Sequence, residues 1–186
     1  MRMVLLGLLA WVAQLALPTG TFVVVPGESQ VTFHVRDNRG GFSGQTDQVS
    51  GTVVVRAADG GYTATVQARV DARTIRTGAS LRDAQMRSAT FLHTREFPFI
   101  RFEGTATAER VSGESFPATL RGRLTVRTVS REVVIPLTVR LTGAGYTAQG
   151  ETTVRFTEFG LPVPRFLIFV AEDLILIRIA AVLRPQ

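Results

Sequence analysis

Most of the chain alternates between apolar and polar residues, which is the pattern of strands that bury one face and expose the other. The clearest run covers residues 116–127, similar runs cover residues 31–36, 62–71, 100–106, 133–141 and 146–156, and residues 51–56 form a β-branched stretch. Glycine-containing turns such as Asp59-Gly60-Gly61 separate them, because glycine adopts the positive φ that tight hairpins need. A last run, residues 174–183, is apolar on both faces. The pattern predicts an all-β chain of about eight or nine antiparallel strands.

One passage has helical spacing instead. The residues that keep this spacing are Leu81, Ala84, Ser88 and Leu92. Ser80 and Asp83 resemble a capping box at its start, and Asp83 stands one turn before Arg87, with which it can pair. We therefore expect one short helix that ends near Ala89.

Antiparallel strands joined by short turns form sandwiches or closed barrels, and a barrel of about eight strands is just wide enough for a slender ligand. The face expected to point inward carries many small residues: Ala64, Ala68, Gly104, Ala106, Ala118, Gly122, Ala148 and Gly150. Small residues there either leave room for a ligand or relieve crowding in a filled barrel, and the pattern alone does not choose. The sequence predicts one barrel domain over residues 21–186.

The N-terminus has a short positively charged start and an apolar run over residues 4–17. A helix that spans a bilayer needs roughly 20 apolar residues, so this shorter run favours a secretory signal peptide over residues 1–20. The cut falls between Ala16 and Gly20, and no clean small-x-small site marks it. We expect a periplasmic or secreted protein, with an uncleaved membrane anchor as the alternative.

Composition limits the chemistry. The 186 residues include no cysteine, which excludes disulfides, thiolate nucleophiles and cysteine metal sites. The formal net charge is +6 and every basic residue is arginine, which raises the question of nucleic-acid binding. The arginines are spread singly, as on solvated strand faces: Arg56, Arg69, Arg101, Arg121, Arg123, Arg140 and Arg155. We expect no nucleic-acid partner.

Few residues could carry catalysis. His34 and His93 are the only histidines, and they fall in different predicted elements. The chain has no Gly-x-Ser-x-Gly elbow, no His-Glu-x-x-His pair and no phosphate-binding loop. We expect no enzyme, no catalytic or metal-binding residues and no required cofactor. A hydrolase that uses His34 or His93 is the disfavoured alternative.

Three segments together resemble the YceI family of polyisoprenoid- and quinone-binding proteins. The first is Ile75 to Leu92 followed by Glu96-Phe97-Pro98-Phe99-Ile100-Arg101-Phe102, the second is Gly122 to Pro136, and the third is Arg155-Phe156-Thr157-Glu158-Phe159-Gly160-Leu161. Thr128 and Glu132 stand where the family usually has glycine and proline. The resemblance implies an antiparallel, lipocalin-like β-barrel of about eight strands with one short helical excursion.

The resemblance also implies non-catalytic binding of a long-chain isoprenoid lipid or quinone inside the barrel, for carriage or storage in the cell envelope. The residues expected to line the barrel are Phe33, Val35, Phe42, Val53, Val55, Val66, Val70, Ile100, Phe102, Leu124, Val126, Leu137, Val139 and Phe156. Those expected at a lid or mouth are Leu81, Met86, Phe91, Leu92 and Phe97. Those expected near a polar headgroup are Arg82, Asp83 and Arg87.

The sequence leaves other functions open. The alternative to a lipid carrier is an envelope stress or interaction protein with a filled barrel. The sequence also leaves open a transient contact with the membrane and the formation of a homodimer.

Overall fold

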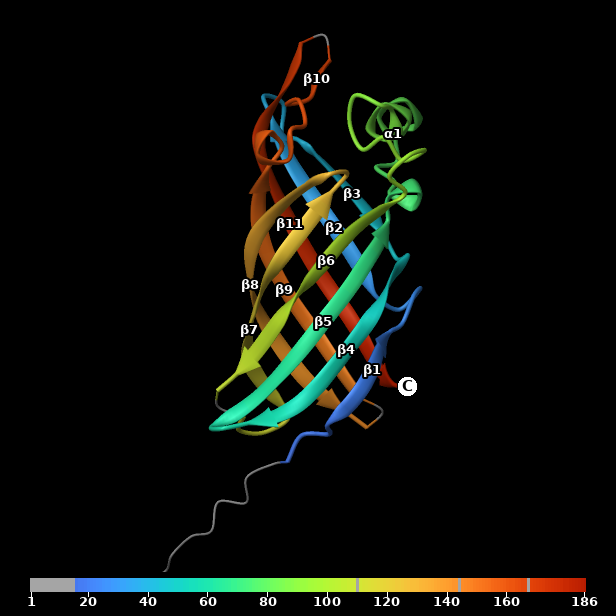
Figure 1. The fold of residues 1–186 in the computed structure, drawn as a ribbon. Helices are drawn as coiled ribbons and strands as arrows, with labels where there is room; N and C mark the ends of the chain where they lie inside the picture. The colour runs from blue at the N-terminus through green and yellow to red at the C-terminus, as the bar shows by residue number, and fades with distance from the viewer. Residues whose placement is uncertain (1–15, 110, 144, 167) are drawn as a thin grey trace, which may run out of the picture.

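A computed structural model describes residues 16–109, 111–143, 145–166 and 168–186. Its strands form a barrel with one helix at one end (Figure 1). The strands are β1 (Gly20–Val24), β2 (Gln30–Asp37), β3 (Phe42–Thr46), β4 (Val49–Ala58), β5 (Gly61–Asp71), β6 (Phe99–Ala108), β7 (Ser115–Val126), β8 (Val129–Thr142), β9 (Gly145–Arg155), β10 (Arg165–Phe166) and β11 (Phe169–Pro185). The helix is α1 (Ser80–Arg87), and two 3-10 turns are η1 (Ala72–Thr74) and η2 (Thr157–Phe159).

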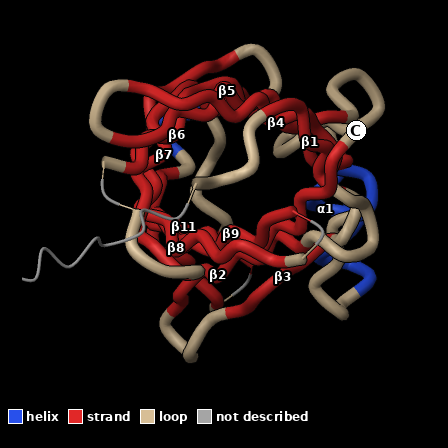
Figure 2. Tube along the Cα trace, turned by 90° about the horizontal axis from the view of Figure 1, so that it is seen from below, coloured by secondary structure: helices blue, strands red, loops and turns tan. Residues whose placement is uncertain are grey.

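All strand pairs are antiparallel, and the sheet closes on itself because β11 follows β9 in the strand order and also pairs with β1, the first strand of that order. On one side β11 pairs with β9, and on the other it pairs first with β2 and then with β1. β1 and β2 lie one after the other and together occupy one strand position of the barrel, and β3 and β4 together occupy the next. The barrel therefore has eight strand positions. Figure 2 shows the strands as a ring. The predicted barrel is confirmed.

Side-chain hydroxyls replace backbone partners where the two long strands break. Between β1 and β2, Ser29 is almost fully buried and its Oγ accepts a hydrogen bond from the Val182 amide at 3.0 Å. Between β3 and β4, Thr46 Oγ1 accepts from the Gln48 amide at 3.1 Å. Both breaks leave the buried backbone satisfied, so the wall bends without opening.

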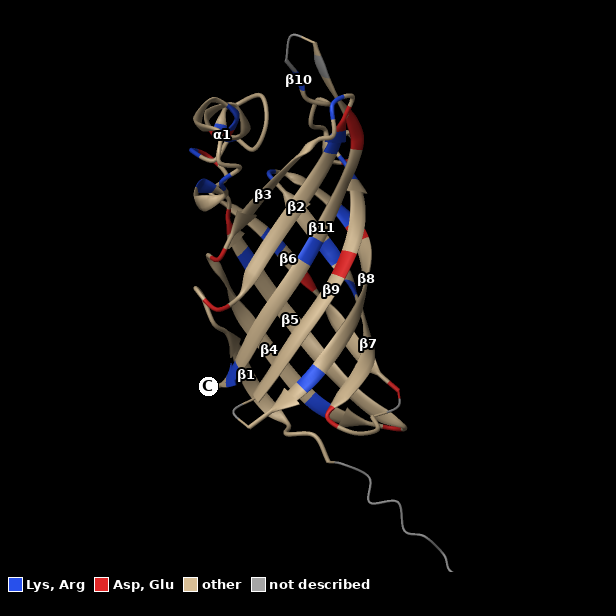
Figure 3. Cartoon of the chain, turned by 180° about the vertical axis from the view of Figure 1, so that it is seen from behind, with Lys and Arg blue, Asp and Glu red and all other residues tan. Residues whose placement is uncertain are grey.

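The inward side chains form two clusters along the barrel axis. One lies at the end farthest from α1 and is built around Phe22, Tyr146 and Leu183. The other lies toward α1 and includes Ile135 and Phe159. The outer surface carries the arginines, which Figure 3 shows scattered along the strands. All seven arginines expected on solvated strand faces are exposed.

The helix forms where it was predicted, but its start differs. Ala79 occupies the N-cap position and makes no side-chain capping bond, so the predicted capping box is wrong. Asp83 turns inward instead, where its Oδ1 accepts from the amide and the hydroxyl of Thr77 at 2.8 and 2.6 Å. Arg87 donates to the Ile75 carbonyl at 3.1 Å rather than pairing with Asp83. Loop contacts therefore hold the helix.

Two glycines let the backbones of β6 and β7 approach closely inside the barrel. Gly104 and Gly122 are direct partners in this ladder. A Cβ at Gly104 would lie 2.8 Å from the Gly122 Cα and 2.9 Å from the Phe102 Cζ, and closer still to the Arg121 carbonyl. The ring of Phe102 thus occupies space that the glycines leave. The glycine pair therefore lets the two strands and the Phe102 ring pack closely, as well as leaving room in the lumen.

We expect Gly104→Ala to destabilise the barrel by about 1–3 kcal/mol, because the new methyl group overpacks against backbone that cannot move independently. Urea unfolding followed by circular dichroism measures this. Gly143→Ala is the matched control, since a Cβ there meets no atom within 4 Å. Equal midpoints for the two variants would contradict the close approach.

Candidate functional site

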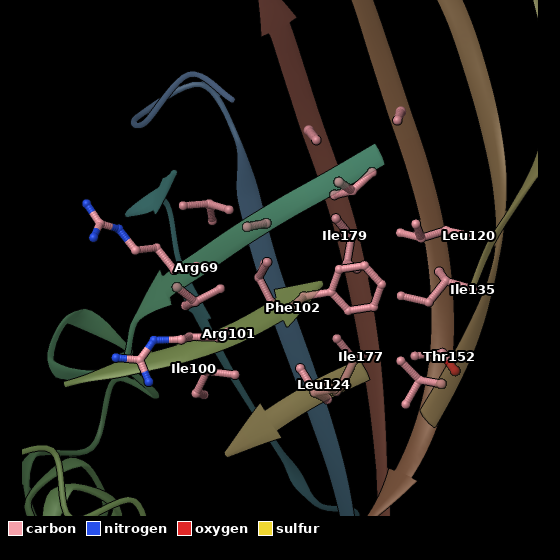
Figure 4. Close-up of a pocket in the computed structure, with 18 of the residues that line it drawn as sticks. Arg69, Ile100, Arg101, Phe102, Leu120, Leu124, Ile135, Thr152, Ile177 and Ile179 are labelled. Carbon is pink, nitrogen blue, oxygen red and sulfur yellow. The ribbon is translucent and has the colours of Figure 1, made fainter. Parts of the chain in front are cut away.

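A continuous apolar cavity of about 360 Å³ occupies the barrel. It extends from Leu17 and Tyr62 at the end farthest from α1 to Arg82 and Leu161 at the α1 end. Few polar residues adjoin it besides the two tyrosines: Thr63, Arg69, Arg82, Gln85, Arg101, Thr107 and Thr152. The guanidinium groups of Arg69 and Arg101 point away from it (Figure 4). The lumen is therefore a site for an apolar molecule, because it offers few hydrogen-bonding partners to a polar one.

The structure brings together all but one of the residues predicted to line the barrel. Those that border the cavity are Phe33, Phe42, Val53, Val55, Val66, Val70, Ile100, Phe102, Leu124, Val126, Leu137, Val139 and Phe156. Val35 does not border it, although it points inward. Its exposed fraction is 0%, and it belongs to the cluster that also contains Phe159 and Leu161 from the loop after β9. That loop fills the space in front of Val35.

Sequence reasoning missed several lining residues. Ile175, Ile177 and Ile179 of β11 face the cavity, as do Leu120, Ile135, Phe159 and Leu161. The run in β11 is apolar on both faces, so alternation could not tell its inner side from its outer side. The pairing of β11 with β9 in the closed barrel, in which Ile177 lies opposite Thr152, determines which face of β11 points inward.

The mouth at the α1 end is formed by part of the predicted lid. Met86, Phe91 and Leu92 border the cavity. Leu81 does not, since it points outward with an exposed fraction of 80%. Phe97 also lies outside the cavity, and its ring packs edge-on against His93 with centroids 5.9 Å apart. The helix contributes Arg82, Gln85 and Met86 to the mouth, and the following loop contributes Phe91 and Leu92.

Of the three residues predicted near a headgroup, only Arg82 adjoins the cavity. Its guanidinium lies 4.3 Å from the centroid of the Phe42 ring, a cation–π contact that joins α1 to β3. Asp83 and Arg87 are used in the loop bonds to Thr77 and Ile75. The Arg87 Nε is nevertheless buried without a hydrogen-bond partner. Of these three residues, the mouth therefore offers a ligand only the guanidinium of Arg82.

The mouth segment is attached to the barrel at two points. Gln45 of β3 and Arg76 exchange both backbone hydrogen bonds, at 2.9 and 3.0 Å. From the other side, Arg127 Nη1 donates to the Phe91 carbonyl at 3.2 Å. Between these two points, residues 77–90 depend mainly on short local contacts. We expect this segment to open locally more readily than the paired strands, because fewer long-range bonds hold it.

The opposite end is closed by tyrosines. Tyr146 packs edge-on against Phe22 with centroids 5.0 Å apart, and its hydroxyl donates to the Pro18 carbonyl. Burial, and then the neighbouring Tyr62, raise the pKa of Tyr146 to about 12. This end is lined by buried apolar and aromatic side chains.

The two histidines lie in separate environments. His34 Nδ1 is 3.0 Å from the Ser43 hydroxyl on an exposed part of β2 and β3. His93 pairs with Glu96 at 3.2 Å in the loop after α1. Neither borders the cavity. Over the described residues, no three metal-binding side chains come together, and no helix there has the length and apolarity to span a bilayer.

An eight-position antiparallel barrel with an apolar lumen and a helical segment at one mouth defines the lipocalin-like class of β-barrels. The YceI-like domain family model matches residues 22–183, and the chain belongs to this family. The match covers every strand from β2 to β10 and most of β1 and β11.

Solved structures have the same fold. Burkholderia cenocepacia BcnA is 18% identical with a TM-score of 0.70, and the match covers 85% of this chain and 98% of that one. A polyisoprenoid binding domain from Saccharophagus degradans, implicated in plant cell wall breakdown, is 15% identical with a TM-score of 0.69, over 89% and 98% of the two chains. The Campylobacter jejuni YCEI protein is 14% identical with a TM-score of 0.54, over 82% and 85%. No curated protein matches the sequence significantly.

The raised pKa of Tyr146 predicts a loss of stability at high pH. The unfolded chain ionises this phenol near its ordinary pKa of 10, whereas the folded chain does so near 12. Stability that is fully present below pH 10 should therefore fall as the pH rises to about 12. Urea unfolding across this range measures it.

The matched control for this prediction is Tyr146→Phe, which should lose much of the pH dependence. The difference in tyrosinate absorbance between wild type and Tyr146→Phe isolates this phenol, because the chain has two tyrosines. Ionisation of Tyr146 at an ordinary pH in the folded protein would contradict the buried position.

Proposed function

We propose that the protein binds a long apolar lipid of the isoprenoid class, a polyisoprenoid or an isoprenoid quinone, inside the barrel and does so without catalysis. The observation that carries this proposal is the continuous apolar lumen of about 360 Å³. Membership of the YceI-like family supports it. So does the similarity to the Saccharophagus degradans domain, which is described as polyisoprenoid binding.

The physical chemistry of the lumen suits a chain-like ligand. Each CH₂ group moved out of water contributes about 0.8 kcal/mol, so several isoprene units bind tightly with few polar contacts. The cavity extends along the barrel from Leu17 at one end to Leu161 at the other, and Phe102, Leu120 and Ile177 are among the side chains that line it (Figure 4). A bulky polar molecule fits this apolar lumen poorly.

Two alternatives are less well supported. A filled barrel, as in an envelope stress or interaction protein, does not need a continuous cavity of this volume. A hydrolase would need His34 or His93 to meet a substrate, and both lie outside the cavity. We therefore propose a binding protein that requires no cofactor.

We also propose that the protein works in the cell envelope, where isoprenoid lipids are carried or stored. The basis is the apolar N-terminal run expected to act as a signal peptide. Residues 1–15 lie outside the described part of the chain. No nucleic-acid partner is proposed, because the arginines are dispersed over the strands (Figure 3) rather than gathered in one patch. A homodimer stays a prediction without a structural argument.

The decisive experiment is organic extraction of the full chain purified from its native source, followed by mass spectrometry. We expect an isoprenoid lipid or quinone at close to one molecule per chain. Repeated absence of lipid, together with no uptake of added quinone, would overturn the proposal.

A variant that fills the lumen gives a second check. Ala106 borders the cavity and Thr105, beside it on β6, is exposed. Ala106→Trp should keep the barrel's circular dichroism but lower lipid occupancy roughly tenfold, because the indole takes up the lumen. Thr105→Trp is the matched control and should bind as wild type does. Equal occupancy in both variants would place the lipid elsewhere.

We propose that the α1 end contacts the membrane transiently while lipid enters or leaves. Two apolar side chains project there, Leu81 of α1 and Ile168 of the turn between β10 and β11, with exposed fractions of 80% and 59%. Figures 1 and 3 both show these elements at the same end of the barrel. The net charge of +6 favours an anionic surface.

The double variant Leu81→Asp/Ile168→Asp should weaken binding to phosphatidylglycerol vesicles about tenfold, because it removes two apolar anchors and adds repulsion. Val134→Asp is the control. Val134 is exposed on the barrel wall, on β8, so this variant adds one negative charge away from the mouth, half of what the double variant adds. Vesicle co-sedimentation measures both. An equal loss for Val134→Asp would contradict a contact specific to the mouth.

A further inference from the structure

The segment that precedes β1 is tied to two separate walls of the barrel. The Leu17 amide donates to the Tyr62 hydroxyl at 3.0 Å, and the Tyr146 hydroxyl donates to the Pro18 carbonyl at 2.5 Å. Tyr62 lies at the start of β5 and Tyr146 at the start of β9. These strands are separated by β6, β7 and β8 around the ring. The segment therefore crosses the end of the barrel farthest from α1 (Figure 1).

One side chain of this segment enters the lumen. Leu17 has an exposed fraction of 6% and borders the cavity, whereas Ala16, Pro18 and Thr19 are exposed. No strand pairing accounts for this position, because β1 begins only at Gly20. The burial of Leu17 follows from the two tyrosine bonds, which set the segment across the opening.

The same bonds keep this end of the lumen dry. Two tyrosine hydroxyls facing an apolar cavity without partners would each cost about 1–3 kcal/mol. Here each hydroxyl is satisfied by backbone of the crossing segment, so the rings can present apolar surface to the lumen. Beside Leu17, the floor is completed by Phe22, Phe116 and Leu183, which belong to the same buried cluster.

We propose that Leu17 and Pro18 form a stopper that closes this end of the barrel, and that the Leu17 side chain determines the longest isoprenoid chain the lumen accepts. This inference rests on the proposed function. A ligand that enters at the α1 end reaches the stopper with its apolar tail. A leucine side chain has four carbons and an isoprene unit has five, so Leu17 occupies about the room of one more unit.

The test uses the full chain and a series of polyprenols that differ by one isoprene unit, each competed against a fluorescent prenol. We expect wild type to show a length above which affinity falls. Leu17→Ala should move this limit upward by about one unit, and Leu17→Phe should move it downward. Shifts of the limit in opposite directions would show that Leu17 sets the accepted chain length. General damage to the barrel would instead lower the affinity for every prenol.

A control variant and a second variant distinguish the effect of the stopper from other effects on binding. Thr19→Ala changes an exposed residue of the same segment and should leave the limit unchanged. Tyr62→Phe/Tyr146→Phe keeps both rings but removes both hydrogen bonds, so longer prenols should bind although Leu17 is intact. If the limit is the same in wild type, Leu17→Ala and Leu17→Phe, the stopper is overturned while lipid binding stands. If wild type binds neither a prenol nor an isoprenoid quinone, the proposed function itself fails.

The stopper also has a consequence for processing. The predicted cut falls between Ala16 and Gly20, and only a cut before Leu17 leaves the stopper on the mature chain. Intact mass spectrometry of the protein from its native source decides this. A mature chain that begins at Leu17 or earlier supports the stopper, and one that begins later overturns it.

Discussion

The closure of the sheet by β11 is the constraint on which the rest of the structure depends. This strand forms its ladder with β9 along one side and with β2 and then β1 along the other, so no strand edge is left between them. Closure turns the alternation of each strand into one shared interior. It also explains the buried hydroxyls of Ser29 and Thr46, because a closed wall that bends must satisfy its backbone internally.

The two ends of this interior differ physically. At one end, the stopper is bound to the rings of Tyr62 and Tyr146 from opposite walls. At the other end, α1 and its loops are held by a cation–π contact and a few backbone-directed bonds, and Leu81 in the first helical turn is exposed. Exchange of an apolar ligand is therefore expected at the α1 end, where local opening breaks fewer contacts.

Two departures from the usual family pattern are accommodated locally. The turn between β7 and β8 lacks the common glycine, and Arg127 takes the left-handed conformation there with φ of 55°. Its side chain reaches the Phe91 carbonyl, so the turn also holds the mouth segment. Glu132 stands where proline is usual and lies 3.5 Å from Arg123, its partner across the ladder. Both residues keep the hairpin intact.

Much of the fold follows from the order of residues alone. Alternation predicted the strands because a half-buried strand must present every second side chain to the core, and thirteen of the fourteen predicted lining residues border the cavity for this reason. Val35 was the exception, because the loop after β9 covers it and no local pattern reports such cover. The inner face of β11, with Ile177, was undetermined, since both of its faces are apolar.

The sequence by itself determined the long alternating strands, their inward faces and the absence of cysteine chemistry, because these depend on side-chain type and spacing. It did not predict the short strands β1 and β3 or the inner face of β11. Only the tertiary structure decided which end of the lumen is closed. Leu17 lies in the predicted leader, and nothing in its neighbourhood marks it as buried. It becomes part of the lumen because Tyr62 and Tyr146, distant in the chain, meet the backbone of the stopper once the barrel has closed.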